Sequence, residues 1–147
     1  MELNFVDDHV TEHFKLSEFA NTLDGNKLLI NAEVINFYQD LEKFRRWYNR
    51  PMVITSGYRT PAFNKRIGGV SNSYHVRGLA VDFRLPEEYY KMDLSRRMSF
   101  ILNIRAKWYN VCRVSGHFGS VILYDTWIHL SYWPYQYWED KRVNKGV

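Results

Sequence analysis

The 147-residue chain is predicted to adopt an α+β fold, in which helices flank a small, mostly antiparallel sheet. Two long stretches repeat apolar residues every three or four positions, which is the period of an amphipathic helix. Shorter stretches rich in β-branched and aromatic residues have the composition of strands. No internal repeat, linker or low-complexity segment divides the chain, so we expect residues 1–147 to form a single domain.

The first part of the chain contains two helical patterns and a strand. Ser17 is expected to cap a short helix within residues 13–20. From Asn31 to Arg50, apolar residues recur on one face of a longer helix, which we expect Pro51 to end. The stretch from Met52 to Ser56 is short and contains β-branched residues, so it is predicted to be a buried strand.

The middle of the chain is well punctuated. Thr60 can cap a short helix, Pro61 suits the first helical position, and Gly68 can close the far end. The stretch from Gly78 to Arg84 alternates as a strand does. A short helix followed by a strand is therefore expected here.

A third substantial helix is expected from about Asp93 to Tyr109. It is followed by a glycine-bounded turn at residues 116–119, and residues 120–133 then have strand composition. The residues predicted to face inward from this helix are Met98, Ile101, Leu102 and Trp108.

The chain is basic, with 20 Lys and Arg residues against 16 Asp and Glu residues and a pI near 9.2. Such a charge attracts polyanions, including nucleic acid and anionic cell-wall polymers. The basic residues are scattered along the sequence, which is typical of solvated helix faces. We therefore expect no specific nucleic-acid partner.

Cysteine usage and the N-terminal residues indicate where the chain is made. Cys112 is the only cysteine, which excludes a disulfide framework and a cysteine-based zinc finger and favours a buried thiol. No basic start leads into an apolar run after Met1, so no signal peptide is visible. No apolar stretch approaches the roughly 20 residues of a membrane helix. We expect synthesis in a cytoplasm and no membrane insertion.

Two predicted strands each carry a polar side chain near their middle. Between Gly78 and Arg84, period two places Asp82 on the face opposite the apolar residues. Burying a carboxylate without compensation is costly, so Asp82 needs a cation, a metal or several donors as partner. In the second strand, His129 shares its face with Trp127 and Ser131. A carboxylate and an imidazole are thus presented in the same manner by two strands.

A second histidine, His75, lies seven residues before Asp82, and small residues between them leave space. Two imidazoles and one carboxylate suit Zn²⁺, and three protein ligands leave a fourth position open, as catalysis requires. A lone histidine such as His75 or His129 is more commonly a hydrogen-bonded structural residue. Only the combination of the three favours a metal site.

Three sequence segments together resemble one known family. They are "SGYR" (Ser56 to Arg59), the pattern Ser-x-His-x-x-Gly-x-Ala-x-Asp from Ser73 to Asp82, and "WIHLS" around His129. They are similar to the zinc D-Ala-D-Ala carboxypeptidase family, whose wider group includes vancomycin-resistance dipeptidases, phage L-alanyl-D-glutamate endolysins and the hedgehog domain. The resemblance runs from about His13 to Trp133. It implies an α+β fold in which His75, Asp82 and His129 bind one zinc ion.

The resemblance also suggests residues that contact substrate. In the family, the arginine corresponding to Arg59 helps to bind and polarise the substrate near the metal, and a guanidinium can grip a carboxylate or an oxyanion. An ion pair with a neighbouring carboxylate is the structural alternative for Arg59. Ser73 is expected to support the site through its hydroxyl or to satisfy a turn amide. Trp127 is a further candidate substrate-binding residue.

The general base is where this sequence departs from the family. Relatives carry Glu or Asp three residues before the last zinc ligand, or His two before it, whereas this chain has Thr126 and Trp127 there. Neither can act as a base at neutral pH. Asp125 becomes the first candidate if a turn or bulge brings its carboxylate inward. His117, on a glycine-flanked loop, is the second.

These observations predict a zinc peptidase that hydrolyses an amide bond in peptidoglycan peptides. The protein is expected to be a phage endolysin or a related cell-wall hydrolase. We expect a monomer, made in a bacterial host cytoplasm and acting on the wall after release. The residues do not choose which peptide bond is cut. One alternative is a zinc-bearing wall or virion binding module that has lost its base. Another is nucleic-acid binding, which predicts salt-dependent DNA retention that survives zinc removal.

Overall fold

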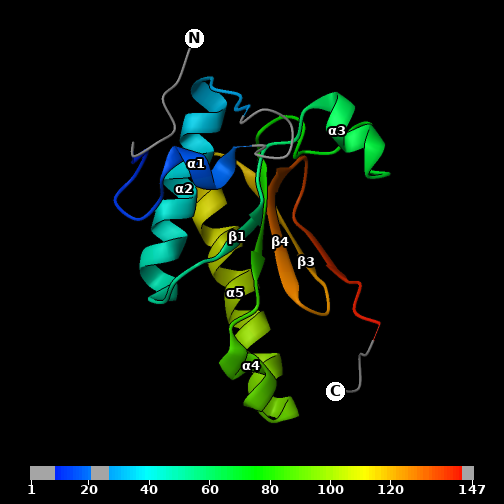
Figure 1. Ribbon diagram of the computed structural model, residues 1–147. Helices are drawn as coiled ribbons and strands as arrows, with labels where there is room; N and C mark the ends of the chain where they lie inside the picture. The colour runs from blue at the N-terminus through cyan, green and yellow to red at the C-terminus, as the bar shows by residue number, and fades with distance from the viewer. Residues whose placement is uncertain (1–8, 21–26, 144–147) are drawn as a thin grey trace.

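One five-stranded sheet, ordered β1-β2-β4-β3-β5, organises the computed structural model, which describes residues 9–20 and 27–143 (Figure 1). The first three neighbouring pairs in this order are antiparallel, and β5 pairs with β3 in parallel. The predicted α+β fold is confirmed, and the sheet is mixed because of this last strand. The strands are β1 (Ile54–Ser56), β2 (Ala80–Arg84), β3 (Phe118–Leu123), β4 (Trp127–Trp133) and β5 (Tyr137–Asp140).

The two long helices pack against one face of the sheet (Figure 1). They meet there because each has an apolar stripe, and the core fills the space between the stripes and the strands. Neither long helix covers the opposite face of the sheet (Figure 1). The helices are α1 (Leu16–Phe19), α2 (Ala32–Tyr48), α3 (Pro61–Arg66), α4 (Glu87–Lys91) and α5 (Leu94–Val114).

Helix α1 is not capped by Ser17, so that prediction was wrong. The helix begins at Leu16, which places Ser17 inside its first turn. Lys15 has the extended backbone of a cap residue, and its N–H donates to the Glu18 carboxylate at 2.7 Å. The cap is therefore made by a side chain three residues further on, because Glu18 reaches back over the first turn.

Helix α2 matches the predicted amphipathic helix, but it ends before Pro51. The Asn31 side chain accepts the Val34 N–H at 2.9 Å and caps the start. At the other end, Asn49 adopts a left-handed conformation, φ 54°, and its N–H donates to the Arg45 carbonyl. Asparagine tolerates this conformation, so the chain leaves the helix two residues before the proline.

Helix α5 extends beyond its predicted end, and two of its expected core residues point elsewhere. Ile101 and Trp108 are buried as predicted, whereas Met98 and Leu102 are 58% and 42% exposed. The first turns of α5 lie beside α4, beyond the ends of the strands (Figure 1), so the sheet does not cover their outer side chains. The buried stripe instead continues toward the C-terminus through Ile104, Val111 and Cys112.

Two strand predictions change in the structure. The stretch from Met52 to Ser56 yields only β1, which is an edge strand with a partly exposed surface rather than a buried strand. Residues 120–133 form most of a hairpin, because a turn at residues 124–126 separates β3 from β4. Strand β5 was not predicted, since its sequence is dominated by aromatic residues that suit either a strand or a surface cover.

Gly119 lets helix α5 approach strand β3 closely. A Cβ atom added to Gly119 would lie 2.8 Å from Trp108 Nε1 and 2.9 Å from Cys112 Sγ. The Trp108 indole N–H in turn donates to the Ser131 carbonyl in β4 at 3.0 Å. Cys112 is a buried free thiol, as predicted, and burial raises its pKa. Helix α5 is therefore tied to both strands of the hairpin.

A buried polar network joins the helices to β4. The Asp40 carboxylate accepts the Tyr132 hydroxyl at 2.6 Å and the Ser115 hydroxyl at 2.5 Å. The Tyr132 oxygen also accepts the Asn36 amide at 2.7 Å. Both hydroxyls contact Asp40 Oδ2, and Lys43 Nζ lies 3.6 Å from Oδ1, so the buried carboxylate is compensated by two donors and one cation. These contacts also hold the strand that carries His129.

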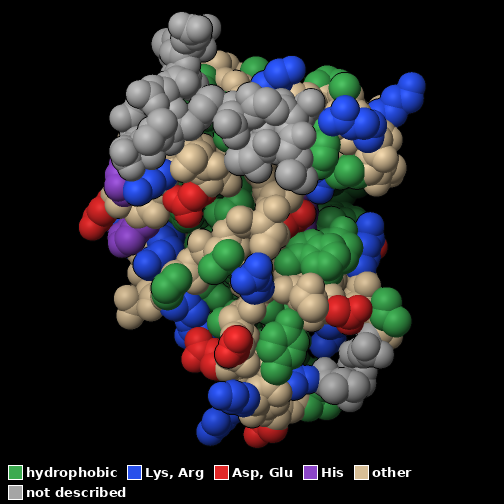
Figure 2. All heavy atoms as spheres, in the orientation of Figure 1, with side chains coloured by type: hydrophobic (Ala, Val, Ile, Leu, Met, Phe, Trp, Pro, Cys, Tyr) green, Lys and Arg blue, Asp and Glu red, His purple; other side chains and the backbone are tan. Residues whose placement is uncertain are grey.

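The surface facing the viewer in Figure 2 carries basic side chains from top to bottom, without one continuous basic patch. Hydrophobic side chains lie between them. Across the described ranges, none of the helices combines the length and apolar character needed to cross a membrane.

Replacing Tyr132 by Phe tests the buried network. Tyr132→Phe removes a donor to a buried carboxylate, so the free energy of unfolding should fall by about 1–3 kcal/mol in urea denaturation. Tyr135→Phe is the matched control, because Tyr135 is exposed and its variant should stay within about 0.5 kcal/mol of the parent. Equal effects of the two substitutions would contradict this role of Tyr132.

Candidate metal centre

Strand register brings the first two polar side chains together. Asp82 in β2 lies directly opposite His129 in β4, and residues opposite each other in an antiparallel pair project from the same face. The His129 Nδ1 atom lies 2.9 Å from Asp82 Oδ1. The neighbouring β4 residues Ile128 and Leu130 point to the other face and are fully buried in the core. Alternation along β4 therefore anchors the strand on one side and presents an imidazole on the other.

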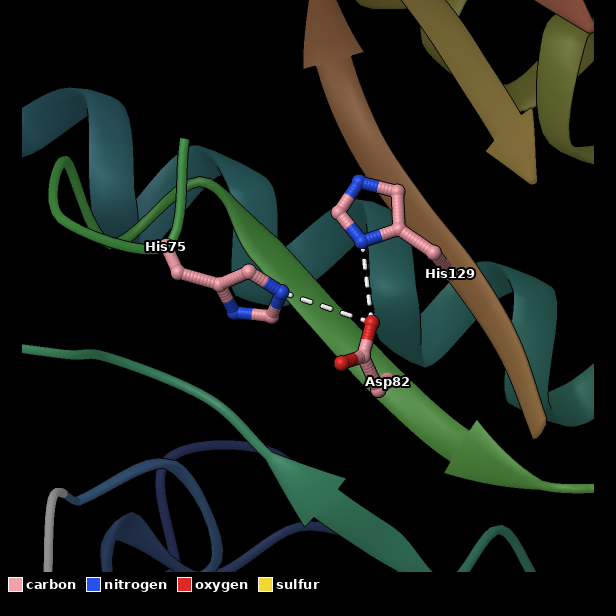
Figure 3. Close-up of side chains that lie close together, drawn as sticks. All are labelled: His75, Asp82 and His129. Carbon is pink, nitrogen blue, oxygen red and sulfur yellow. Dashed lines mark hydrogen bonds and ion pairs between the residues drawn. The ribbon is translucent and has the colours of Figure 1, made fainter. Parts of the chain in front are cut away.

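His75 reaches the same carboxylate from the loop before β2. Figure 3 shows both imidazoles directed toward Asp82, and His75 Nε2 lies 3.3 Å from Asp82 Oδ1. The other ring nitrogen of His75, Nδ1, lies 2.7 Å from the Gly57 carbonyl oxygen and donates to it, which orients the ring so that Nε2 points at Asp82. One potential ligand atom from each of the three residues lies within 4.8 Å of the others.

Gly57 can orient His75 because the chain packs tightly at this point. A Cβ atom at Gly57 would lie only 2.6 Å from the Phe19 carbonyl oxygen, so a larger residue would push the loop away from α1. The next residue, Tyr58, donates its N–H to that same carbonyl at 2.8 Å. The position of the Gly57 carbonyl, and with it the His75 ring, therefore depends on contact with α1.

Electrostatics favour the metal-binding protonation states of Asp82 and His129. Burial opposes ionisation of Asp82, but hydrogen bonds and charge from His129 and His75 outweigh it and hold the carboxyl pKa well below its usual range. Burial lowers the pKa of His129, against the opposing attraction of Asp82. A carboxylate beside a neutral imidazole is the form that coordinates a divalent ion.

The donor set fits zinc. Zinc accepts imidazole nitrogen and carboxylate oxygen, and tetrahedral bonds of about 2.0–2.1 Å separate neighbouring ligand atoms by about 3.3 Å. The two histidine contacts with Asp82 Oδ1, at 2.9 and 3.3 Å, are close to this separation. His75, Asp82 and His129 can thus converge on one ion with little rearrangement, and three protein ligands leave a further position open.

Arg59 borders this group. Its Nη2 atom lies 3.7 Å from Asp82 Oδ2, and its backbone N–H donates to the His75 carbonyl at 3.0 Å. The guanidinium also donates from Nε to the Ser56 hydroxyl and from Nη1 to the Asn64 side chain, both at 3.3 Å. Arg59 is therefore ion-paired with a predicted ligand and held at the edge of the site. Both the substrate-binding role and the ion-pair role predicted for it are compatible with this position.

Ser73 and Trp127 each lie close in sequence to one of the predicted ligands. The Ser73 hydroxyl accepts the His75 N–H at 3.2 Å, so it supports the turn that carries the ligand. Trp127 lies two residues before His129 and shares its face. Its ring stacks on Tyr124, with centroids 4.4 Å apart and planes 12° from parallel. The stacked pair forms an aromatic surface beside the metal ligands.

Asp125 and His117, the two candidate bases, are not among the side chains that converge here. Asp125 lies in the β3–β4 turn, where its carboxylate accepts the Val143 N–H at 3.2 Å. His117 lies before β3, with its ring stacked on Tyr132 at 4.0 Å and its Nδ1 close to Ser115. His117 thus belongs to the buried polar network beside Asp40, on the helix side of the sheet.

Glu139 is a polar residue on this face that the sequence did not indicate. It lies opposite Ile122 in β3, and Ile122 lies opposite His129, so the three share one row across the strands. Its carboxylate accepts the Tyr137 hydroxyl and lies 3.6 Å from Lys141 Nζ. The parallel pairing of β5 that creates this row has no local sequence signal. The Gly57 carbonyl was missed for a related reason, because a main-chain ligand leaves no side-chain pattern.

Comparison with known protein families finds a match that covers most of the chain. The family model described as Peptidase M15 matches residues 12–131, a span that includes the three predicted ligands and Arg59. A search of curated proteins finds no match to the chain.

Zinc content tests the metal centre directly. Purified protein should hold about one zinc ion per chain, whereas His75→Ala should hold well below one, because the variant loses one of three ligands. His9→Ala is the matched control, since His9 is exposed and lies outside the three-residue group. Elemental analysis by mass spectrometry measures both. Full zinc retention in His75→Ala would contradict the assignment.

Proposed function

Because the chain belongs to the peptidase M15 family, we propose that it hydrolyses an amide bond in bacterial peptidoglycan peptides with the help of one zinc ion. Peptidases of this family are zinc-dependent, which agrees with the donor set of this chain. The observation that carries the proposal is the convergence of His75, Asp82 and His129 beside Arg59 on the sheet face that the long helices leave open.

In this proposal, different residues around the site have different roles in catalysis. When bound, zinc supplies a Lewis acid that polarises the scissile carbonyl and lowers the pKa of water toward about 7. Arg59 presents guanidinium N–H groups next to the ligands, where they can hold a substrate carboxylate or a developing oxyanion. The Tyr124–Trp127 stack offers an apolar wall that orients the peptide and excludes water on that side.

A general base on or near this face would move the proton from water to the leaving amine. Asp125 is the candidate that its sequence position suggests, and it would have to exchange its contact with the Val143 N–H for one with substrate or water. Glu139, in the same row as His129, is the candidate that the sheet topology suggests. Replacing each by its amide separates the two.

We further propose that the protein is an endolysin-type cell-wall hydrolase of phage origin. The resemblance of the segments at Ser56–Arg59, Ser73–Asp82 and around His129 to a group that includes phage endolysins supports it. In this proposal the protein is a monomer, is made in a bacterial host and acts on the wall after release. Both D-Ala-D-Ala cleavage and L-alanyl-D-glutamate cleavage are compatible with the ligands, because the choice depends on the walls of the site.

A zinc-bearing binding module is the second candidate. The absence of a carboxylate or imidazole at Thr126 and Trp127, where relatives place the base, favours it. The hedgehog domain of the resembling group uses such a site without established peptidase work. A binding module would sediment with the wall and release no new amino termini.

Digestion of purified peptidoglycan tests the proposed function. Zinc-loaded protein should release fragments with new amino termini, and their masses identify the bond that is cut. Chelated protein and His75→Ala serve as controls and should release none, because both lack the metal. If zinc is bound stoichiometrically and no fragments are released from several types of peptidoglycan, the proposed function becomes that of a zinc-bearing binding module.

Variants of Arg59 and of the two carboxylates test the division of work. Arg59→Ala should keep zinc and lower kcat/KM by about 10²–10³, the range for loss of one donor to a developing oxyanion. Of Asp125→Asn and Glu139→Gln, the one that removes the base should keep zinc and lose turnover. Unchanged kcat/KM in Arg59→Ala would leave that residue with only its ion pair to Asp82.

A further inference from the structure

We infer that a group of aromatic rings next to the metal centre binds the saccharide strand of peptidoglycan, an inference that rests on the proposed function. The aromatic cluster consists of Tyr74, Trp133, Tyr135 and Tyr137. Trp133 lies at its centre, with ring centroids 4.9 Å from Tyr74, 6.1 Å from Tyr137 and 6.4 Å from Tyr135. Tyr135 and Tyr137 are 6.3 Å apart. The four rings thus form one connected group.

The aromatic cluster is continuous with the face that carries the metal ligands. Tyr74 directly precedes the predicted ligand His75. Trp133 follows His129 by four positions in the same strand, so both project from one face, roughly 13 Å apart at about 3.3 Å per residue. Tyr137 pairs with Ser120, which pairs with Ser131 between the two. A ligand held at the metal can therefore extend along β4 onto these rings.

Three of the rings are outside the hydrophobic core. The core lies on the opposite face of the sheet and does not include Trp133, Tyr135 or Tyr137. Tyr135 is 57% exposed, whereas Tyr38 and Tyr132 are buried in the core. A group of aromatic rings held together at the surface, beside a candidate active site, indicates a binding surface more than a packing element.

The chemistry of these rings suits a saccharide. A pyranose ring presents a C–H face that stacks on an aromatic ring, and its hydroxyls need donors and acceptors at the rim. The tyrosine hydroxyls supply these, and Glu139 accepts the Tyr137 hydroxyl at the edge of the cluster. The proposed substrate carries its saccharide covalently attached to the peptide. A peptide held at the metal centre therefore brings a sugar ring within reach of the same face.

The charges around the cluster favour a neutral ligand over nucleic acid. Arg77 lies over the Tyr74 ring at 4.4 Å, but it pairs with Glu33 at 3.4 Å. On the other side, Lys141 lies 3.6 Å from Glu139. These two described cations thus each have a nearby carboxylate. A nucleic-acid strand requires uncompensated cations along its phosphates, whereas a saccharide does not.

Titration with a soluble tetramer of N-acetylglucosamine tests the inference without any peptide hydrolysis. Wild-type protein should bind the tetramer, with a change in tryptophan fluorescence or heat on mixing. Tyr135→Ala should weaken the affinity roughly tenfold, as loss of one stacking ring does. Trp47→Ala is the matched control, because Trp47 is 41% exposed and lies on α2 beside α5, away from the metal face. Its affinity should equal that of wild type.

A kinetic comparison separates this inference from the proposed function. If the protein is a peptidase, Tyr135→Ala should raise KM more for a disaccharide-linked stem peptide than for the free stem peptide, and an equal rise for both would overturn the inference. If no peptide is cut but the tetramer binds and Tyr135→Ala weakens tetramer binding, the inference is supported and the proposed peptidase function is rejected. Peptidoglycan digestion without tetramer binding overturns the inference alone. So does binding of a single-stranded oligonucleotide, and not of the tetramer, to the same rings.

Discussion

The pairing of β2 with β4 places the buried Asp82 carboxylate opposite His129, and the surroundings are arranged to compensate that charge. Desolvation of a carboxylate is expensive, so it persists only where donors or cations surround it. His129 approaches from β4, His75 from the preceding loop and Arg59 from the loop after β1. Three segments that are distant in sequence are thereby held around the two carboxylate oxygens of Asp82. A divalent cation is the natural partner for such a set.

The sheet separates stability from chemistry by using its two faces differently. Alternate residues of β4 enter the core, where Trp108 and the Asp40 network hold the strand from behind. On the other side of the strand, Trp127, His129 and Trp133 are only partly buried. Because the outward side chains stand on a strand that is fixed from the other side, little conformational entropy is lost when a metal or substrate binds.

The outward face is organised along β4, with the candidate metal ligand His129 between two aromatic surfaces. The Tyr124–Trp127 stack lies toward the hairpin turn, and the aromatic cluster around Trp133 lies toward the other end. An extended substrate that follows the strand would meet an apolar wall, then the ligands and Arg59, then rings suited to a sugar. This layout agrees with a substrate that is part peptide and part saccharide. The parallel pairing of β5 with β3 also places Glu139 in the row of His129. Neither the strand order nor this pairing can be read from the local sequence.

The sequence by itself determined the α+β class, the long amphipathic helices and the residues His75, Asp82, His129 and Arg59, because period and motif are local properties. The tertiary structure decided what depends on contacts between distant segments. Examples are the Gly57 carbonyl that orients His75, the parallel strand β5, and the exposure of Met98 at a helix end that the sheet does not cover. The proton-transfer group belongs to the same class. A side chain such as Asp125 is placed by the turn and its neighbours, and no spacing rule contains that information.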